Sequence, residues 1–144
     1  MEIYTVGFTK KSAEQFFGLL KRAGIKRLLD IRLNNVSQLA GFTRRDDLKF
    51  FLREICGADY QHEPLLAPTK DILESYRKTK DWTSYEKAFN QLIAMRRIEN
   101  IFAPDYFKTP TVLLCSEPTA TQCHRRLVVE YLKEHIPGII VTHL

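Results

Sequence analysis

The sequence lacks the features that mark membrane, repeat and disordered proteins. No apolar run approaches the roughly 20 residues that a membrane-spanning helix needs, so we expect no membrane segment. The absence of repeats, low-complexity segments and linkers predicts one domain over residues 1–144. Because the first residues already alternate like a strand, we expect no signal peptide and a cytoplasmic location.

Cysteine is scarce, with three in the chain, which argues against a disulfide framework in a protein without a signal peptide. Cys115, Cys123 and His124, with a distant His62 or His143, are candidate zinc ligands by residue type. Their spacing matches none of the short paired spacings of zinc sites. We therefore expect no metal, no cofactor, and cysteines that stay reduced.

The sequence also lacks the protein-phosphatase loop, in which an arginine follows the cysteine by six positions. Thr121 stands six positions after Cys115, and Val129 six positions after Cys123. The chain is therefore not assigned to these phosphatases, and no sequence motif identifies a reaction.

Charge of one sign is only in modest excess. The chain carries 22 Lys and Arg against 17 Asp and Glu, a formal charge of +5. That balance is weak for a dedicated nucleic-acid binder and suits phosphorylated ligands. We expect an anionic small molecule or a nucleic acid as partner, while the oligomeric state stays open. Basic pairs begin at Lys10, Arg44, Arg96 and Arg125, and we interpret the first three as solvated surface.

Apolar strand patterns alternate with amphipathic helix patterns along the chain. The predicted strands are residues 3–8, 27–32, 58–61, 112–114 and 139–141. An all-helical insertion precedes the fourth of them. This order predicts an α/β protein with three layers, in which helices flank a mainly parallel sheet of about five strands.

Local signals set the helix boundaries. Ser12 followed by Gln15 predicts a capping box, and Thr43 is expected to cap the next helix. Gly24, Gly57 and Gly138 are expected to end helices. The last helix should begin after the turn at residues 116–121, capped by Thr119 or Thr121.

Polar residues gather where the predicted strands end. In open α/β sheets, ligands bind beyond the carboxyl ends of the strands. The residues at those ends are Gly7, Asp30 with Arg32, His62, Cys115 with Glu117, and His143. The chemistry and the fold rule therefore point to one edge of the sheet.

Three residues are candidates for catalysis. Cys123, at a helix start, has the setting of a nucleophile or redox thiol, or it packs under the turn. Glu117 lies in the turn and is the acid–base candidate. Asp30 suits either acid–base work or holding an arginine. Cys115 is interpreted as a small apolar residue that ends a buried strand.

Ligand contacts are expected from Arg32 and Arg125, whose guanidinium groups suit phosphate. The alternative is an ion pair, such as Arg125 with Asp30 or Glu117. The other expected ligand-binding residues are His62, Ser37 and His124. The free N–H groups of the last helix would favour the same anion.

A family resemblance rests on four short segments and spans essentially the whole chain. The segments are Tyr4-Thr5-Val6-Gly7, Asp30-Ile31-Arg32, Cys115-Ser116-Glu117 and Cys123-His124-Arg125, which together resemble the domain of unknown function 488 family. Residues 32–42 resemble a compact branch of it. Larger members carry a proline in this loop and a His or Asn after the first glycine, where this chain has Asn35 or its neighbours, and Phe8. The resemblance implies an α/β domain and supplies no reaction.

Three functions fit these patterns. The first is an enzyme, such as a hydrolase, acting on a phosphorylated or nucleotide-like substrate, with nucleic acid included. The second is a non-catalytic module that binds an anion or nucleic acid. The third is a thiol redox or metal-binding protein built on Cys115 and Cys123.

Overall fold

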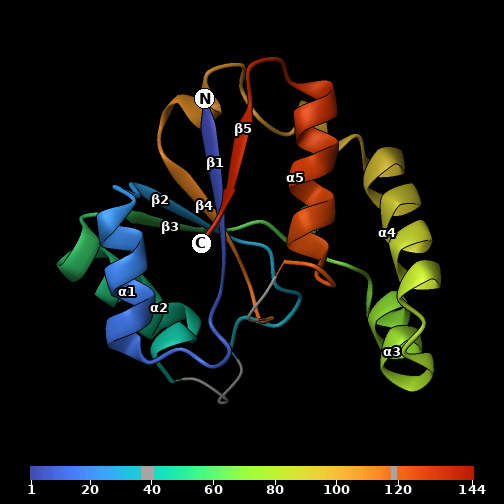
Figure 1. The fold of residues 1–144 in the computed structure, drawn as a ribbon, viewed down its shortest axis with the longest axis horizontal. Helices are drawn as coiled ribbons and strands as arrows, with labels where there is room; N and C mark the ends of the chain where they lie inside the picture. Colours follow the sequence, from blue (N-terminus) through green and yellow to red (C-terminus); the bar gives the residue numbers. More distant parts are fainter. Residues whose placement is uncertain (37–40, 118–119) are drawn as a thin grey trace.

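The computed structural model describes residues 1–36, 41–117 and 120–144. Within them, five strands form one sheet in the order β3-β2-β4-β1-β5, and every pairing is parallel (Figure 1). The strands are β1 (Glu2–Gly7), β2 (Arg27–Asp30), β3 (Asp59–His62), β4 (Thr111–Cys115) and β5 (Ile140–His143). The predicted α/β class and five-stranded parallel sheet are confirmed.

Helices cover both faces of the sheet, which completes the three predicted layers. Figure 1 shows α1 (Ala13–Arg22) and α2 (Arg45–Phe51) on one side, and α5 (His124–His135) on the other. The predicted insertion before β4 is helical too, with α3 (Lys70–Thr79) packing on α4 (Trp82–Arg96) and α4 packing on α5. Short helical turns complete the chain: Gly41–Thr43, Leu52–Cys56, Pro64–Leu66, Ile98–Asn100 and Tyr106–Lys108.

The sheet divides the core into two apolar clusters because side chains alternate along each strand. On β2, Leu28 packs toward the α1 and α2 side, while Leu29 packs toward α4 and α5. Leu114 and Leu113 divide in the same way on β4. The central strands are therefore buried on both faces, and their polar ends meet at one edge.

Several helix boundaries follow the predicted local signals. The Ser12 hydroxyl accepts a hydrogen bond from the Gln15 N–H at 3.1 Å, and the Gln15 side chain accepts one from the Ser12 N–H at 2.9 Å. Gly24 and Gly57 take left-handed backbone angles, with φ of 69° and 59°, where helical segments end. Glycine adopts these angles at no steric cost.

Other boundaries differ from the prediction for structural reasons. Thr43 does not cap α2, because it lies in the preceding helical turn and Arg44 occupies the cap position. The last helix begins only at His124, with Cys123 rather than Thr121 as its N-cap, and the Thr119 alternative lies outside the described residues. That helix also ends at His135, before Gly138.

The last strand is not buried as predicted. β5 pairs only with β1 and forms an edge of the sheet, and Ile140 is 63% exposed. An apolar run of three residues does not distinguish an edge strand from a central one. No helix in the described part of the chain is long and apolar enough to cross a membrane.

The capping box gives a test of the fold. Ser12→Ala removes one hydrogen bond at the start of α1 and should cost about 1 kcal/mol of the free energy of unfolding. For a chain of this size, the midpoint of thermal unfolding should fall by about 3–4 °C. Ser75→Ala, an exposed position inside α3, is the matched control and should leave the midpoint unchanged or slightly higher. Equal midpoints for the two variants would contradict the capping role.

Candidate functional site

The connection from β4 to α5 is anchored on the end of β1. Gly7 and Cys115 are register partners at the carboxyl ends of these two strands. The backbone N–H of Thr9 donates to the Ser116 carbonyl at 3.0 Å, and the Thr9 hydroxyl donates to the same oxygen. The first residues after Cys115 are therefore fixed against β1.

Gly7 is required by close packing. A β-carbon on Gly7 would overlap the carbonyl group of Glu117 and lie 2.5 Å from a guanidinium nitrogen of Arg125. Any larger residue would therefore displace the connection, the arginine, or both. The glycine lets the β4–α5 connection pass directly over the end of β1.

Cys115, Cys123 and His124 form a buried cluster. The two sulfur atoms lie 2.7 Å apart, and Nδ1 of His124 lies 3.4 Å from the Cys115 sulfur. Nε2 of His124 lies 2.7 Å from the Ile31 carbonyl oxygen, which can only accept, so Nε2 carries the proton. The other ring nitrogen, Nδ1, faces the sulfur of Cys115.

The two thiols differ in acidity. Burial raises the pKa of the Cys115 thiol, but hydrogen bonds from the Cys123 thiol and the Glu117 N–H, with the charge of Arg125, lower it below the ordinary value. Burial raises the pKa of Cys123, and the neighbouring Cys115 raises it further. Cys115 is therefore the more acidic thiol of the pair, and Cys123 donates the hydrogen bond between them.

Arg125 is a completely buried cation without a carboxylate partner. Its Nη1 donates to the Glu117 carbonyl oxygen at 2.5 Å. Its Nε has no hydrogen-bond partner, and no ion pair in the described part of the chain includes it. The alternative role for Arg125, an ion pair with the side chain of Asp30 or Glu117, is thus not seen among the described residues.

The charge of Arg125 reaches other groups at this edge. Burial and, second, Arg125 lower the pKa of Lys11. The pKa of His143 is lowered by the same two causes in the same order. The start of α5 adds N–H groups that no side chain within the described residues caps. This edge of the sheet is therefore electropositive.

Arg32, the other arginine singled out, is held by a carboxylate and a backbone carbonyl. Its Nε and Nη2 donate to the two Asp30 oxygens at 2.9 and 2.8 Å, and Nη2 also donates to the Thr43 carbonyl at 2.6 Å. Asp30 accepts further bonds from the Arg32 N–H and the Tyr60 hydroxyl. The geometry favours holding an arginine over acid–base work for Asp30. A ligand role for Arg32 stays a prediction that requires this pair to open.

The remaining predicted residues are dispersed around this edge. Nε2 of half-buried His62 lies 2.9 Å from the Arg32 carbonyl oxygen. The side chain of Glu117 is exposed, and His124 belongs to the buried cluster. Ser37 lies outside the described residues. The structure thus brings Cys123, His124 and Arg125 together with Cys115, while Asp30, Arg32 and His62 form a second, adjoining network.

The same cluster is the place where a metal ion would fit. The ligand atoms of Cys115, Cys123 and His124 lie within 4.8 Å of one another. The Nε2–H bond to the Ile31 carbonyl is also typical of metal-binding histidines. The expectation of metal-free thiols is not tested by this geometry and stays a prediction.

Helix α4 contributes residues that the sequence did not single out. The Phe89 ring packs edge-on against His124 at 5.5 Å. Burial, and then the nearby Cys115 and Cys123, raise the pKa of Tyr85. The apolar stripe of α4 was visible in the sequence, but which residues it packs against depends on tertiary contacts.

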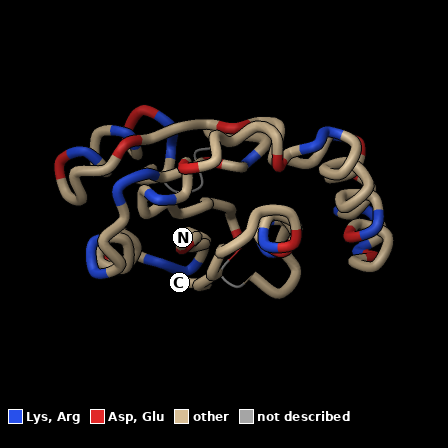
Figure 2. The backbone as a smooth tube through the Cα atoms, turned by 90° about the horizontal axis from the view of Figure 1, so that it is seen from above, with Lys and Arg blue, Asp and Glu red and all other residues tan. Residues whose placement is uncertain are grey.

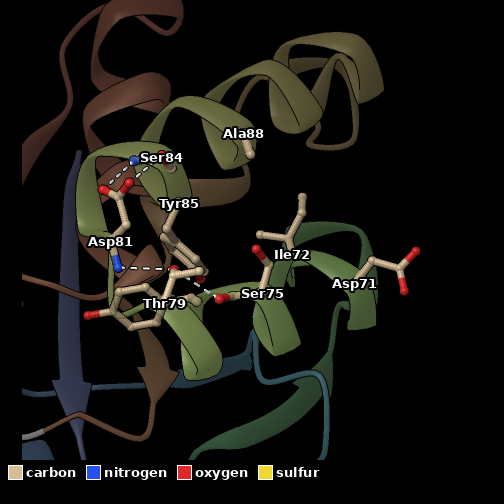
Figure 3. Close-up of a pocket in the computed structure, with 9 residues that line it drawn as sticks. Asp71, Ile72, Ser75, Thr79, Asp81, Ser84, Tyr85 and Ala88 are labelled. Carbon is tan, nitrogen blue, oxygen red and sulfur yellow. Dashed lines mark hydrogen bonds between the residues drawn. The ribbon is translucent and has the colours of Figure 1, made fainter.

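Tyr85 also lines a cleft between α3 and α4. The cleft has a volume of about 310 Å³, and Figure 3 shows its lining side chains, including Ile72 and Ser75 from α3 and Ala88 from α4. Asp81 and Thr79 close one end through hydrogen bonds at the turn between the helices. Tyr85 therefore lines this cleft and also has a pKa that burial and then the two cysteines raise.

These observations define a class: parallel α/β proteins with a buried cysteine pair and a buried arginine at the carboxyl edge of the sheet. The chain belongs to the family described as "Domain of unknown function DUF488", whose sequence model matches residues 12–132. The match contains both networks of the site and leaves out the whole of β1 and β5. Neither the curated proteins nor the solved structures gave a match.

The packing over Gly7 can be tested by adding one methyl group. Gly7→Ala should destabilise the fold by at least about 1–3 kcal/mol, because the backbone of the β4–α5 connection must move. Gly18→Ala in α1 is the control, since a β-carbon there meets only the flexible Arg22 side chain and improves helix propensity. Thermal unfolding measures both variants, and a Gly7→Ala protein as stable as wild type would contradict the described packing.

Proposed function

We propose that this protein is an enzyme that acts on a phosphorylated or nucleotide-like substrate at the carboxyl edge of the sheet. The observation that carries the proposal is the completely buried Arg125, which has charge and an unused Nε–H donor but no carboxylate partner in the described residues. An unsatisfied buried donor costs about 1–3 kcal/mol, so a ligand oxyanion that accepts from it would relieve a cost already present.

Two further features support an anionic ligand. The start of α5 offers uncapped N–H groups beside Arg125, and such helix ends favour phosphate. After burial, the Arg125 charge is the second cause that lowers the pKa values of Lys11 and His143. These basic groups therefore lie close together. A bound dianion would stabilise all these groups in their charged or donating forms.

Aromatic side chains beside the site support a nucleotide-like substrate. Trp82 stacks on Tyr85 with ring centroids 5.0 Å apart, and the Arg126 guanidinium lies over the Trp82 ring at 5.9 Å. Trp82 is half-buried, so part of its surface is open to a base. Stacking of a base on such a ring is worth about 1–3 kcal/mol.

The distribution of charge favours a small substrate over a nucleic acid. Figure 2 shows basic and acidic positions interspersed along the helices on both sides of the sheet. A nucleic-acid interface typically needs a continuous basic surface. The positive potential in this protein is instead concentrated around one buried arginine.

The chemistry that fits this arrangement is nucleophilic catalysis. The Cys115 thiolate would attack the phosphorus of a substrate held by Arg125, and the bond to the leaving oxygen would break. The exposed carboxyl group of Glu117 would protonate that oxygen and then activate the water that releases phosphate. Cys115 thus takes the nucleophilic role that the sequence assigned to Cys123, because Cys115 is the more acidic thiol.

Arg125→Lys tests the binding part of the proposal. The lysine keeps the charge and removes both the unsatisfied Nε and the two-pronged geometry. We expect the midpoint of thermal unfolding to change little, and the affinity for inorganic phosphate and for nucleoside monophosphates to fall by about tenfold in calorimetry.

Arg27→Lys is the matched control, since Arg27 lies at the amino end of β2 and donates to the Tyr106 carbonyl. It should bind phosphate like wild type. Normal binding by Arg125→Lys together with a large loss of stability would make Arg125 a structural residue. Cys115→Ser then separates the functions: turnover of phosphomonoesters should be lost with binding retained, whereas unchanged turnover excludes Cys115 as nucleophile.

A further inference from the structure

The sulfur atoms of Cys115 and Cys123 are too close for an ordinary contact. They lie 2.7 Å apart, while a disulfide bond measures about 2.05 Å. Both cysteines are free thiols in this structure. The two side chains come from different elements, the end of β4 and the N-cap of α5, so the fold itself brings them together.

The distance distinguishes between two uses of such a pair. Two thiolates on one tetrahedral zinc ion, with bonds of about 2.3 Å, lie about 3.8 Å apart. The observed separation is more than 1 Å shorter than that and about 0.6 Å longer than a disulfide. A metal ion would require the sulfurs to separate, whereas a disulfide requires only a small approach.

We propose that Cys115 and Cys123 are a redox pair that a small hydroperoxide converts into an intramolecular disulfide. We assign Cys115 as the attacking sulfur, because it accepts the hydrogen bond from Cys123. Cys123, in direct contact, is the resolving sulfur. His124 closes the cluster, with its Nδ1 3.4 Å from the Cys115 sulfur.

The chemistry proceeds in two steps. The Cys115 thiolate attacks one peroxide oxygen, the O–O bond breaks, and the departing hydroxide takes a proton from solvent, which leaves a sulfenic acid. The Cys123 sulfur then attacks the Cys115 sulfur, the S–O bond breaks, and the hydroxyl group leaves as water with the Cys123 proton. The two sulfurs together lose two electrons, which reduce the peroxide to two molecules of water.

Burial restricts the oxidant by size. Cys115 is 5% exposed and Cys123 3%, so a small reagent reaches these sulfurs more readily than glutathione disulfide, which must bring its own disulfide bond into contact with one of them. Hydrogen peroxide should therefore react, while glutathione disulfide should not. The third cysteine, Cys56, is buried in the cluster beneath α1 and has a pKa raised by burial, which makes it an internal control.

The disulfide has a consequence that rests on the proposed function. Oxidation removes the Cys115 thiolate, so it would switch off catalysis and protect that sulfur from irreversible oxidation. The disulfide itself does not depend on the proposed substrate. If the disulfide forms but phosphate does not bind, the redox proposal stands and the proposed enzymatic function is wrong.

Counting thiols tests the proposal on the wild-type protein. The chain holds three cysteines. After treatment with hydrogen peroxide and denaturation, one titratable thiol should remain, and mass spectrometry should find the peptides of Cys115 and Cys123 linked. Glutathione disulfide at the same concentration should leave all three. Three thiols after peroxide, a linkage that involves Cys56, or stoichiometric zinc that blocks oxidation would each overturn the proposal.

Single substitutions assign the roles. In Cys123→Ser, dimedone should trap a sulfenic acid on Cys115, and no disulfide should form. In Cys115→Ser, Cys123 should stay unmodified at the same peroxide dose. Cys56→Ala is the matched control and should form the disulfide at the wild-type rate. Because the wild-type linkage decides the proposal, it stays testable even if a cysteine variant does not fold.

Discussion

The candidate site depends on one electrostatic constraint, the burial of the Arg125 cation without a carboxylate beside it. Removing a charge from water costs several kcal/mol even after the protein relaxes. The described residues offset part of this cost with the Glu117 carbonyl. Hydrogen bonds from Cys123 and Glu117, and then the charge of Arg125, lower the pKa of the Cys115 thiol against the effect of burial, so loss of that proton would place a negative charge near Arg125.

This constraint accounts for the local architecture. The Glu117 carbonyl can approach Arg125 only because Gly7 has no side chain and because Thr9 fixes Ser116 against β1. α5 begins late, at His124, which places Arg125 in its first turn and Cys123 at its cap. The parallel pairing of β1 with β4 therefore determines where the thiolate and the cation meet.

The two arginines at this edge show how partners decide a role. Arg32 is held by both oxygens of Asp30, and Asp30 is held in turn by Tyr60. A ligand at that network would have to compete with the bonds between Arg32 and Asp30. Arg125 has the same guanidinium group, but its Nε–H has no partner. A ligand could therefore accept a hydrogen bond from Arg125 without breaking an existing one.

Much of the fold was predictable because its signals are local. The capping box at Ser12, the glycine after α1 and the alternation of apolar strands need only neighbouring residues, and the carboxyl-edge rule then gathers the polar strand ends. The exposure of β5 was missed, since edge position depends on strand order. Thr43 was expected as a cap but instead offers its carbonyl to Arg32.

The acidity of the thiols could not be predicted from the sequence. Cys115 was expected to be a small apolar residue because it ends a buried strand. Its surroundings, namely the Cys123 thiol, two backbone N–H groups and Arg125, come together only in the folded chain. Tyr85 and Phe89 of α4 were missed for the same reason, because no spacing relates them to residues on α5.

The most direct test of the coupling between Arg125 and Cys115 is the pH dependence of alkylation at each cysteine. Iodoacetamide reacts with thiolates, and mass spectrometry follows Cys115 and Cys56 separately in one sample. The midpoint for Cys115 should lie below the ordinary thiol range and that for Cys56 above it, since burial raises the pKa of Cys56. In Arg125→Gln, the Cys115 midpoint should move upward while that of Cys56 stays fixed. Two results would contradict this account: a Cys115 midpoint at or above that of Cys56, or a Cys115 midpoint that is the same in Arg125→Gln as in wild type.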